Sequence, residues 1–252
     1  MTTFYPVFLN LKGRRCIVIG GGKIAEGKVL KLIDSGAKIF VISPDATPAI
    51  RDAADRGAIE FNLRKYQAGD LEGAFLAIAA TNDRVVNQVI FEEAENLGVL
   101  LNAVDDPARC SFIAPSIIER GPVTLAISTG GASPALARKL RETLAQSPAL
   151  DWADATSVLS KARQIIKEKQ VAVDPQRWQC CMTPELLALA RSDREDEALE
   201  KLLDDLLGKY SNGMCSNIGE CVAGGCVTRN PSSRGATESA DNQGRVAQTA
   251  GD

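Results

Sequence analysis

The sequence predicts an α/β protein whose first hundred or so residues form a parallel sheet with helices on both faces, followed by a helical region. Three observations support this fold class. Short apolar runs alternate with helix-length amphipathic stretches, a glycine-rich turn follows the first run, and the pattern is helical from residue 152 to 207. Strands that are apolar along their whole length are typical of parallel sheets, because helices cover both faces of such a sheet.

The first half of the chain supplies the strands and helices of the predicted sheet. Runs rich in β-branched apolar residues predict strands, and apolar residues at helical spacing predict helices. Gly36 and Gly98 suit helix C-termini, and Pro44 closes the second strand. In chain order, the expected strands are 14–19, 38–43, 59–63, 74–80 and 99–104, and the expected helices are 25–35, 47–56 and 85–97.

The pattern changes after Asp105. Residues 111–118 and 123–128 are predicted strands, and Ser133-Pro134 begins a helix that runs to about Leu144, with serine as N-cap and proline at the first helical position. From residue 211 onward there is no Leu, Phe, Trp, Tyr or Lys. We predict a disordered tail over 211–252, because such a segment buries too little apolar surface to offset its ordering entropy.

Composition excludes several classes of function. The 252 residues carry a net charge of −3 and no apolar stretch long enough to cross a bilayer, so we expect neither a nucleic-acid partner nor membrane insertion. The chain has no histidine, which excludes Ser-His-Asp triads and imidazole metal sites. Without a signal-like N-terminus, the expected location is cytoplasmic, with reduced cysteines. The spacing of the tail cysteines matches no standard zinc or iron–sulfur pattern, so no metal site is predicted. They are Cys215, Cys221 and Cys226.

The glycine-rich turn predicts a dinucleotide site. Gly20-x-Gly22-x-x-Ala25 follows the first strand and precedes the first helix, as the dinucleotide-binding fingerprint requires. The first glycine permits the tight turn, the second admits a pyrophosphate, and the small third residue lets helix and strand pack closely. Lys23 and Ile24 lie at the helix N-terminus, which favours negative charge. The predicted sheet is therefore of the Rossmann type.

Further cofactor residues are expected where neighbouring strands end. Pro44 and Asp45 follow the second strand, and the Asp45 carboxylate is placed to reach the ribose hydroxyls. No arginine stands beside Asp45 in the sequence to accept a 2′-phosphate, so NAD is favoured over NADP. Thr81 and Asn82 end the strand at 74–80 and are expected to line the cofactor site.

Several segments together resemble one family. The chain is similar to the precorrin-2 dehydrogenase/sirohydrochlorin ferrochelatase family, which is also the N-terminal module of siroheme synthase. The resemblance covers about residues 4–145 and is specific through the order and spacing of its motifs. They are YPVFL at 5–9, CIVIGGGKIA at 16–25, AIAATND at 77–83, NAVD at 102–105, SFIAPSII at 111–118 and STGGASP at 128–134.

The resemblance implies NAD+-dependent oxidation of precorrin-2 to sirohydrochlorin and, in many members, insertion of Fe2+ to give sirohaem. It also implies a homodimer, and no methyltransferase half like that of fused siroheme synthases is expected. A dehydrogenase that works beside a separate chelatase is one alternative, and a non-catalytic nucleotide-sensing module is another. The implied organisation is an NAD-binding domain at 1–112, a dimerisation region of α+β type at 113–148, a helical domain at 149–210 and the tail at 211–252.

The resemblance places the key aspartate of the family at Asp105. This residue follows the strand at 99–104, at the edge of a parallel sheet where ligands bind. A carboxylate there accepts the proton released in the oxidation, and in metal insertion it accepts pyrrole protons. Asp106 is adjacent, so the sequence leaves the choice between the two carboxylates open.

The tetrapyrrole substrate carries many carboxylates, and polar or basic residues are candidates to bind it. The loop before the helix at 133 is favoured because it leads into a helix N-terminus. Arg109, Arg120 and Lys139 are additional candidates for carboxylate contacts. The expected substrate-binding residues are Asn102, Ser128, Thr129, Gly130, Gly131 and Arg138.

Overall fold

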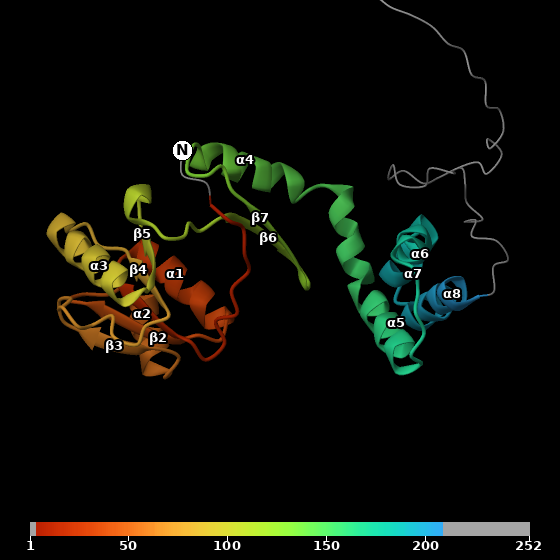
Figure 1. The fold of residues 1–252 in the computed structure, drawn as a ribbon, viewed down its shortest axis with the longest axis horizontal. Coiled ribbons are helices and arrows are strands. Elements are labelled where there is room, and N and C mark those ends of the chain that lie inside the picture. Colours follow the sequence, from red (N-terminus) through yellow and green to blue (C-terminus); the bar gives the residue numbers. More distant parts are fainter. Residues whose placement is uncertain (1–3, 209–252) are drawn as a thin grey trace, which may run out of the picture. The chain divides into compact units, whose positions relative to one another are not determined.

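The protein, described by a computed structural model over residues 4–208, divides into two compact units at Ala153 and Asp154 (Figure 1). The predicted tail and its cysteines lie outside the described residues. The first unit contains β1 (Arg15–Ile19), α1 (Lys23–Asp34), β2 (Lys38–Ser43), α2 (Pro48–Asp55), β3 (Glu60–Leu63), β4 (Leu76–Ala79), α3 (Arg84–Leu97), β5 (Leu100–Ala103), the 3-10 turn η1 (Pro107–Arg109), β6 (Ser116–Arg120), β7 (Val123–Ile127) and α4 (Pro134–Leu144). A second 3-10 segment, η2 (Pro148–Ala155), reaches into the second unit, which then contains α5 (Thr156–Glu168), α6 (Pro175–Cys181), α7 (Pro184–Arg191) and α8 (Glu195–Leu207).

The first five strands form one parallel sheet in the order β3-β2-β1-β4-β5. This order confirms the predicted Rossmann-type sheet, because the chain reverses its direction of travel between β1 and β4. The register pairs Ile19 with Ile42 on one side and with Ala79 on the other. All five strands therefore end at one edge, where the loops that follow them come together.

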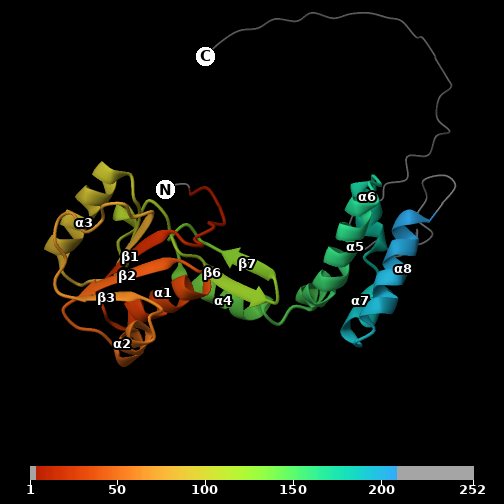
Figure 2. The ribbon, with the colours of Figure 1, turned by 90° about the horizontal axis from the view of Figure 1, so that it is seen from below.

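Helices cover both faces of the sheet, as the apolar strands predict (Figure 2). On one face, α1 and α2 pack against alternate strand residues such as Val18 and Val41. On the other face, α3 packs Ile90 and Ala94 against residues such as Ile17 and Ala77. Burial on both faces explains why the central strands are apolar without alternation.

One predicted strand differs in part from the structure. The sequence predicts a strand over 111–118, whereas β6 begins at Ser116 and pairs antiparallel with β7. The amides of Ser111 and Phe112 instead donate to the Leu101 carbonyl at the free edge of β5. Pro115 has no amide hydrogen to extend a ladder. The segment before β6 therefore covers the edge of the large sheet rather than joining the small one.

The second unit is a helical cluster, in line with the predicted pattern. Helix α8 contacts α5, α6 and α7 and carries the fully buried Leu202. Asp174 and Thr183 cap α6 and α7 with their side chains, and proline follows each cap. Every helix within residues 4–208 is too short or too polar to cross a membrane.

Glu93 on α3 fixes the connection between β3 and β4. Its carboxylate accepts hydrogen bonds from the amides of Gly69 (3.1 Å) and Leu71 (2.8 Å) and from the Tyr66 hydroxyl. Leu71 is fully buried, so no water can replace that partner. Burial, together with the hydrogen bond to Glu93, raises the pKa of Tyr66.

We expect Glu93→Ala to lower the free energy of unfolding by about 1–3 kcal/mol, because it leaves a buried amide and a half-buried hydroxyl without partners. Urea unfolding followed by circular dichroism measures the change. Glu92→Ala is the control, since Glu92 is exposed and its side chain, within residues 4–208, bonds Gln88 alone. Equal stability of the two variants contradicts this role for Glu93.

Candidate active site

The turn between β1 and α1 lies against two neighbouring loops. A Cβ atom at Gly20 would come within 2.3 Å of the Ala80 carbonyl oxygen, and one at Gly21 within 1.9 Å of the Asp45 carbonyl oxygen. Gly20 also has a φ of +119°. Only glycine fits at these two positions. The turn is therefore packed between the ends of β2 and β4, at the point where the strand order reverses.

Gly22 differs from the two glycines before it. A Cβ atom there would meet no protein atom within 4 Å, and the backbone is extended. Gly22 is the N-cap of α1 but offers no side chain to its amides, whereas Thr47, Asp83 and Ser133 cap α2, α3 and α4 with side-chain oxygens. Open space beside uncapped amides fits a pyrophosphate group.

The predicted cofactor residues surround this turn. Ala25 is fully buried against the sheet, as the third position of the fingerprint requires, while Ile24 is 54% exposed. The Lys23 ammonium lies 3.0 Å from Glu26 at the same helix end. Pro44 and Asp45 lie exposed at the end of β2. Past the end of β4, Thr81 is half-buried and Asn82 is exposed, so the structure brings together the residues predicted for the cofactor.

The sequence predicts no arginine beside Asp45, and the three-dimensional structure shows that this expectation is wrong. Nη2 of Arg51, from the first turns of α2, donates to Asp45 Oδ1 at 2.7 Å. Two hydrogen bonds lower the pKa of Asp45, the larger effect coming from the Ala46 amide and the smaller from the Arg51 side chain. The carboxylate therefore stays ionised. The helical path of α2 returns Arg51 to a residue six positions earlier, a contact that adjacency in the sequence does not reveal.

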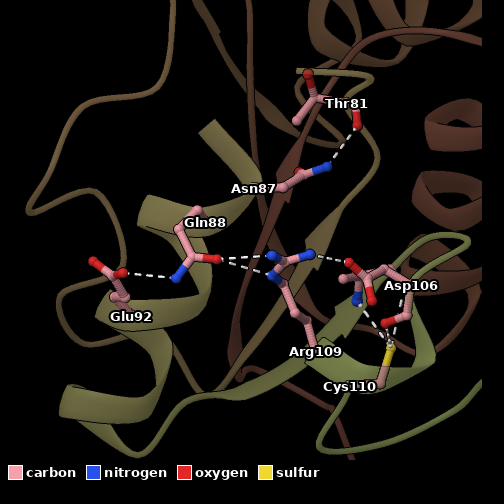
Figure 3. Close-up of polar contacts among 8 residues, drawn as sticks. Thr81, Asn87, Gln88, Glu92, Asp106, Arg109 and Cys110 are labelled. Carbon is pink, nitrogen blue, oxygen red and sulfur yellow. Dashed lines mark hydrogen bonds and ion pairs between the residues drawn. The ribbon is translucent and has the colours of Figure 1, made fainter. Parts of the chain in front are cut away.

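Asp105 and Asp106 have different surroundings. Asp105 is exposed with a left-handed φ of +60°, and within residues 4–208 its carboxylate forms no hydrogen bond or ion pair. The Asp106 carboxylate forms an ion pair with Arg109 (Figure 3). A general base needs a carboxylate that can approach the substrate. The arrangement therefore favours Asp105 and assigns Arg109 to an internal contact.

A lysine and a cysteine accompany Asp105. Burial and the neighbouring Lys31 lower the pKa of the Lys28 ammonium on α1, whereas Asp105 and Cys110 raise it. Burial raises the pKa of Cys110, whose sulfur lies 3.2 Å from both the amide nitrogen and the carbonyl oxygen of Ala103. The thiol is thus a neutral hydrogen-bonding group at the end of β5.

The predicted substrate-binding residues are spread over two places. Asn102 is buried, and its Nδ2 donates to the Phe112 carbonyl at 3.0 Å, which gives it a structural contact beside Asp105. In the loop after β7, Ser128 Oγ accepts from the Gly130 amide and Thr129 Oγ1 from the Ser133 amide. In the described chain, no hydrogen bond or ion pair joins this loop to Asp105.

The glycines and basic residues of this region also have assigned contacts. Gly130 and Gly131 both have positive φ, at +62° and +88°, which shapes the turn into α4. Arg138 lies 3.0 Å from Glu142 and is largely exposed, and Arg120 lies 2.7 Å from Asp151.

Sequence reasoning missed Gly21, Arg51 and Gln88. Gly21 occupies an unspecified position of the fingerprint, and the run of three consecutive glycines is the only signal of its close approach. Arg51 is an exposed polar residue and Gln88 a half-buried one, each on an ordinary helix. Their contacts depend on tertiary geometry, so no local signal identifies them.

Comparisons with known proteins agree with this geometry. Residues 7–116 match the model of an NAD(P)-binding family, and residues 120–147 match that of the central region of sirohaem biosynthesis proteins. A siroheme synthase from Photorhabdus laumondii is 34% identical over 215 residues, which is 82% of this chain and 46% of that protein. A siroheme synthase from Methylococcus capsulatus is 46% identical over 138 residues, which is 55% of this chain and 29% of that protein.

A solved structure of SirC, a precorrin-2 dehydrogenase, matches this chain with a TM-score of 0.63 and 29% identity, and the match covers 79% of this chain and 98% of that one. The chain belongs to the precorrin-2 dehydrogenase family found as a module of siroheme synthases. It spans about half the length of the Photorhabdus synthase. The NAD(P)-binding match contains both the β1–α1 turn and Asp105.

We expect Gly22→Asp to weaken NAD+ binding by about 100-fold or more, because placing like charges together costs several kcal/mol. Folding should be unaffected, since a Cβ atom at this position meets no protein atom within 4 Å. Titration calorimetry measures the affinity, and far-UV circular dichroism checks the fold.

Two further glycine variants act as controls. Gly22→Ala adds an uncharged methyl group to open space and should bind NAD+ better than Gly22→Asp. Gly21→Ala should instead lose stability, because its Cβ would overlap the Asp45 carbonyl. Unchanged NAD+ affinity in Gly22→Asp contradicts a pyrophosphate at this turn.

Proposed function

We propose that the protein oxidises precorrin-2 to sirohydrochlorin with NAD+. The observation that carries the proposal is the exposed, unpaired Asp105 at the same sheet edge as the uncapped N-terminus of α1. The likeness to a solved precorrin-2 dehydrogenase supports the substrate. Membership of a family with an NAD(P)-binding module supports the cofactor class.

Two sets of residues take part in the proposed reaction: one binds the cofactor and the other accepts a proton. When bound, NAD+ would supply the acceptor for a hydride from the macrocycle. The α1 amides beside Gly22 hold the pyrophosphate, and Asp45 bonds the ribose hydroxyls. Asp105 accepts the proton that leaves the macrocycle, so the substrate loses one hydride and one proton in total. The carboxylate serves as this acceptor because the chain has no histidine.

We propose NAD+ rather than NADP+ as the cofactor. The ionised Asp45 carboxylate repels a 2′-phosphate, although Arg51 beside it partly offsets this charge. Both side chains are well exposed, so solvent screens their interaction. Titration with both dinucleotides tests the preference, which Asp45→Ala should reduce.

We also propose that Fe2+ is a second substrate, inserted into sirohydrochlorin to give sirohaem. Two pyrrole protons leave as the metal enters. We propose that the Asp105 carboxylate accepts the first and passes it to solvent before it accepts the second. Across residues 4–208 there is no group of three or more Cys, Asp or Glu side chains arranged to hold a metal ion. The proposal is therefore direct transfer to the nitrogens of the macrocycle.

A homodimer formed through residues 113–148 is part of the proposal. Helix α4 packs against the two-stranded β6–β7 sheet and buries Ala137. It leaves Leu136, Leu140 and Leu144 exposed by 50%, 40% and 38%, and their spacing places them on one face. A two-stranded sheet is marginally stable alone, and an exposed apolar stripe is typical of an interface.

We infer a cytoplasmic location for this activity. The cysteines at 16, 110 and 181 are free thiols. Burial raises the pKa of Cys16 and Cys181 to about 11, which keeps both thiols protonated. Free, unreactive thiols are typical of proteins kept in reducing compartments.

We expect Asp105→Asn to lower the dehydrogenase rate by about 100- to 10,000-fold, the usual contribution of a general base. The spectrum of sirohydrochlorin and the formation of NADH measure the rate. Chelation should fall with it. The melting temperature should stay near that of the unmodified protein, since within residues 4–208 the exposed Asp105 carboxylate forms no hydrogen bond or ion pair.

Asp106→Asn separates the two neighbouring carboxylates. It keeps the side-chain shape and should retain more activity than Asp105→Asn, because Asp106 faces Arg109 rather than the substrate. An inactive Asp106→Asn beside an active Asp105→Asn would falsify the assignment.

We expect Leu140→Lys to convert the dimer to a monomer, because a charge at the centre of the apolar stripe is buried without a partner on association. Light scattering coupled to gel filtration measures the mass. Leu140→Met conserves side-chain volume and should remain dimeric. A dimeric Leu140→Lys protein contradicts an interface on this face of α4.

A further inference from the structure

The backbone around Asp105 is fixed by the residue that follows it. The Asp106 amide donates to the Ala103 carbonyl at 3.3 Å. The Asp106 carbonyl accepts from the Arg109 amide at 3.1 Å and from the Cys110 thiol at 3.3 Å. Its carboxylate pairs with Arg109. Asp105 lies within the turn that the bond from Asp106 to Ala103 closes, and its backbone is left-handed. Among residues that carry a side chain, few other than aspartate and asparagine adopt that conformation.

Arg109 connects this loop to helix α3. Its Nε and Nη2 donate to Gln88 Oε1 at 3.1 and 2.8 Å, while Nη1 pairs with Asp106 (Figure 3). The Gln88 amide is oriented in turn, because its Nε2 donates to Glu92 at 2.7 Å. The Arg109 and Asp106 side chains are 36% and 31% exposed, so water screens the pair less than it screens a surface pair.

The same helix also holds the loop on the cofactor side. Asn87 precedes Gln88, and its Nδ2 donates to the Thr81 carbonyl at 3.0 Å (Figure 3). Two consecutive residues of α3 therefore bond the loop after β4 and, through Arg109, the loop after β5. A helix is rigid over so short a distance, and sites built on helices are more precise than sites on loops.

We propose that Gln88 and Arg109 are positioning residues that fix the Asp105 carboxylate relative to the cofactor site. The inference rests on the proposed function, in which Asp105 is the base. Gln88 holds the Arg109 guanidinium, Arg109 holds Asp106, and Asp106 sets the backbone of the residue before it. Neither Gln88 nor Arg109 contacts the substrate in this arrangement.

Arg109 is also a candidate, from the sequence, to bind substrate carboxylates. In the structure, all three of its guanidinium nitrogens already donate to Gln88 or Asp106. Within residues 4–208 these bonds use three of the five guanidinium N–H groups and leave a substrate carboxylate one on Nη1 and one on Nη2. The contacts therefore favour an internal role, and the two roles predict different kinetic changes.

Gln88→Ala tests the positioning role because it leaves Arg109 and both aspartates in place. We expect kcat for precorrin-2 oxidation to fall by about 10- to 100-fold, since small misplacements of a catalytic group have effects of that size. KM for precorrin-2 and the affinity for NAD+ should stay unchanged. Hydrogen exchange of the amides from Ala103 to Cys110 should become faster.

The matched control is the double exchange Gln88→Glu with Glu92→Gln, which keeps an acceptor for Arg109 at position 88 and a donor–acceptor pair between positions 88 and 92. It should recover most of the lost kcat and most of the protection of the amides. A raised KM with normal kcat in Gln88→Ala would assign the pair to substrate binding and overturn the proposal. Unchanged kcat, or equal losses in both variants, would overturn it as well.

A double-mutant cycle separates this inference from the proposed function. If Gln88 acts through Asp105, Gln88→Ala should cause no further loss in the Asp105→Asn background. A full additional loss there overturns the positioning role while leaving Asp105 as the base. Full activity of Asp105→Asn alone refutes the base itself, and the positioning role fails with it.

Discussion

The β1–α1 turn lies so close to the backbone of two neighbouring loops that no side chain fits at Gly20 or Gly21. This approach joins the ends of β2 and β4 around the N-terminus of α1. It depends in turn on the parallel register that aligns Ile19 with Ile42 and Ala79. The other features of the site lie at this edge of the sheet. The uncapped amides, the carboxylate of Asp45 and the loop at Thr81 all lie around one turn.

Two adjacent aspartates after β5 have different surroundings because their backbone conformations differ. Asp106 is turned toward Arg109 and helix α3, so its charge is used inside the protein. Asp105 takes a left-handed conformation and presents an unpaired carboxylate. In the proposed function, identical residues one position apart supply an anchor and a base.

Much of this architecture could be predicted from the sequence. Apolar strands, helix caps such as Thr47 and Asp83 and the glycine fingerprint are local patterns, and local physics fixes them. The composition of the segment at 111–118 suits a strand. Its first residues, however, donate hydrogen bonds to the free edge of β5 instead of pairing with β7. Arg51 beside Asp45 and Gln88 beside Arg109 arise only when helices pack on the sheet. No local pattern encodes those distances.

The most direct test of the proposed site is a crystal structure of the protein with NADH and sirohydrochlorin bound together. We predict the pyrophosphate over Gly22 and the macrocycle within hydrogen-bond reach of the Asp105 carboxylate, with Asp106 still paired to Arg109. A macrocycle bound away from Asp105, or a dinucleotide away from the α1 N-terminus, would contradict this assignment.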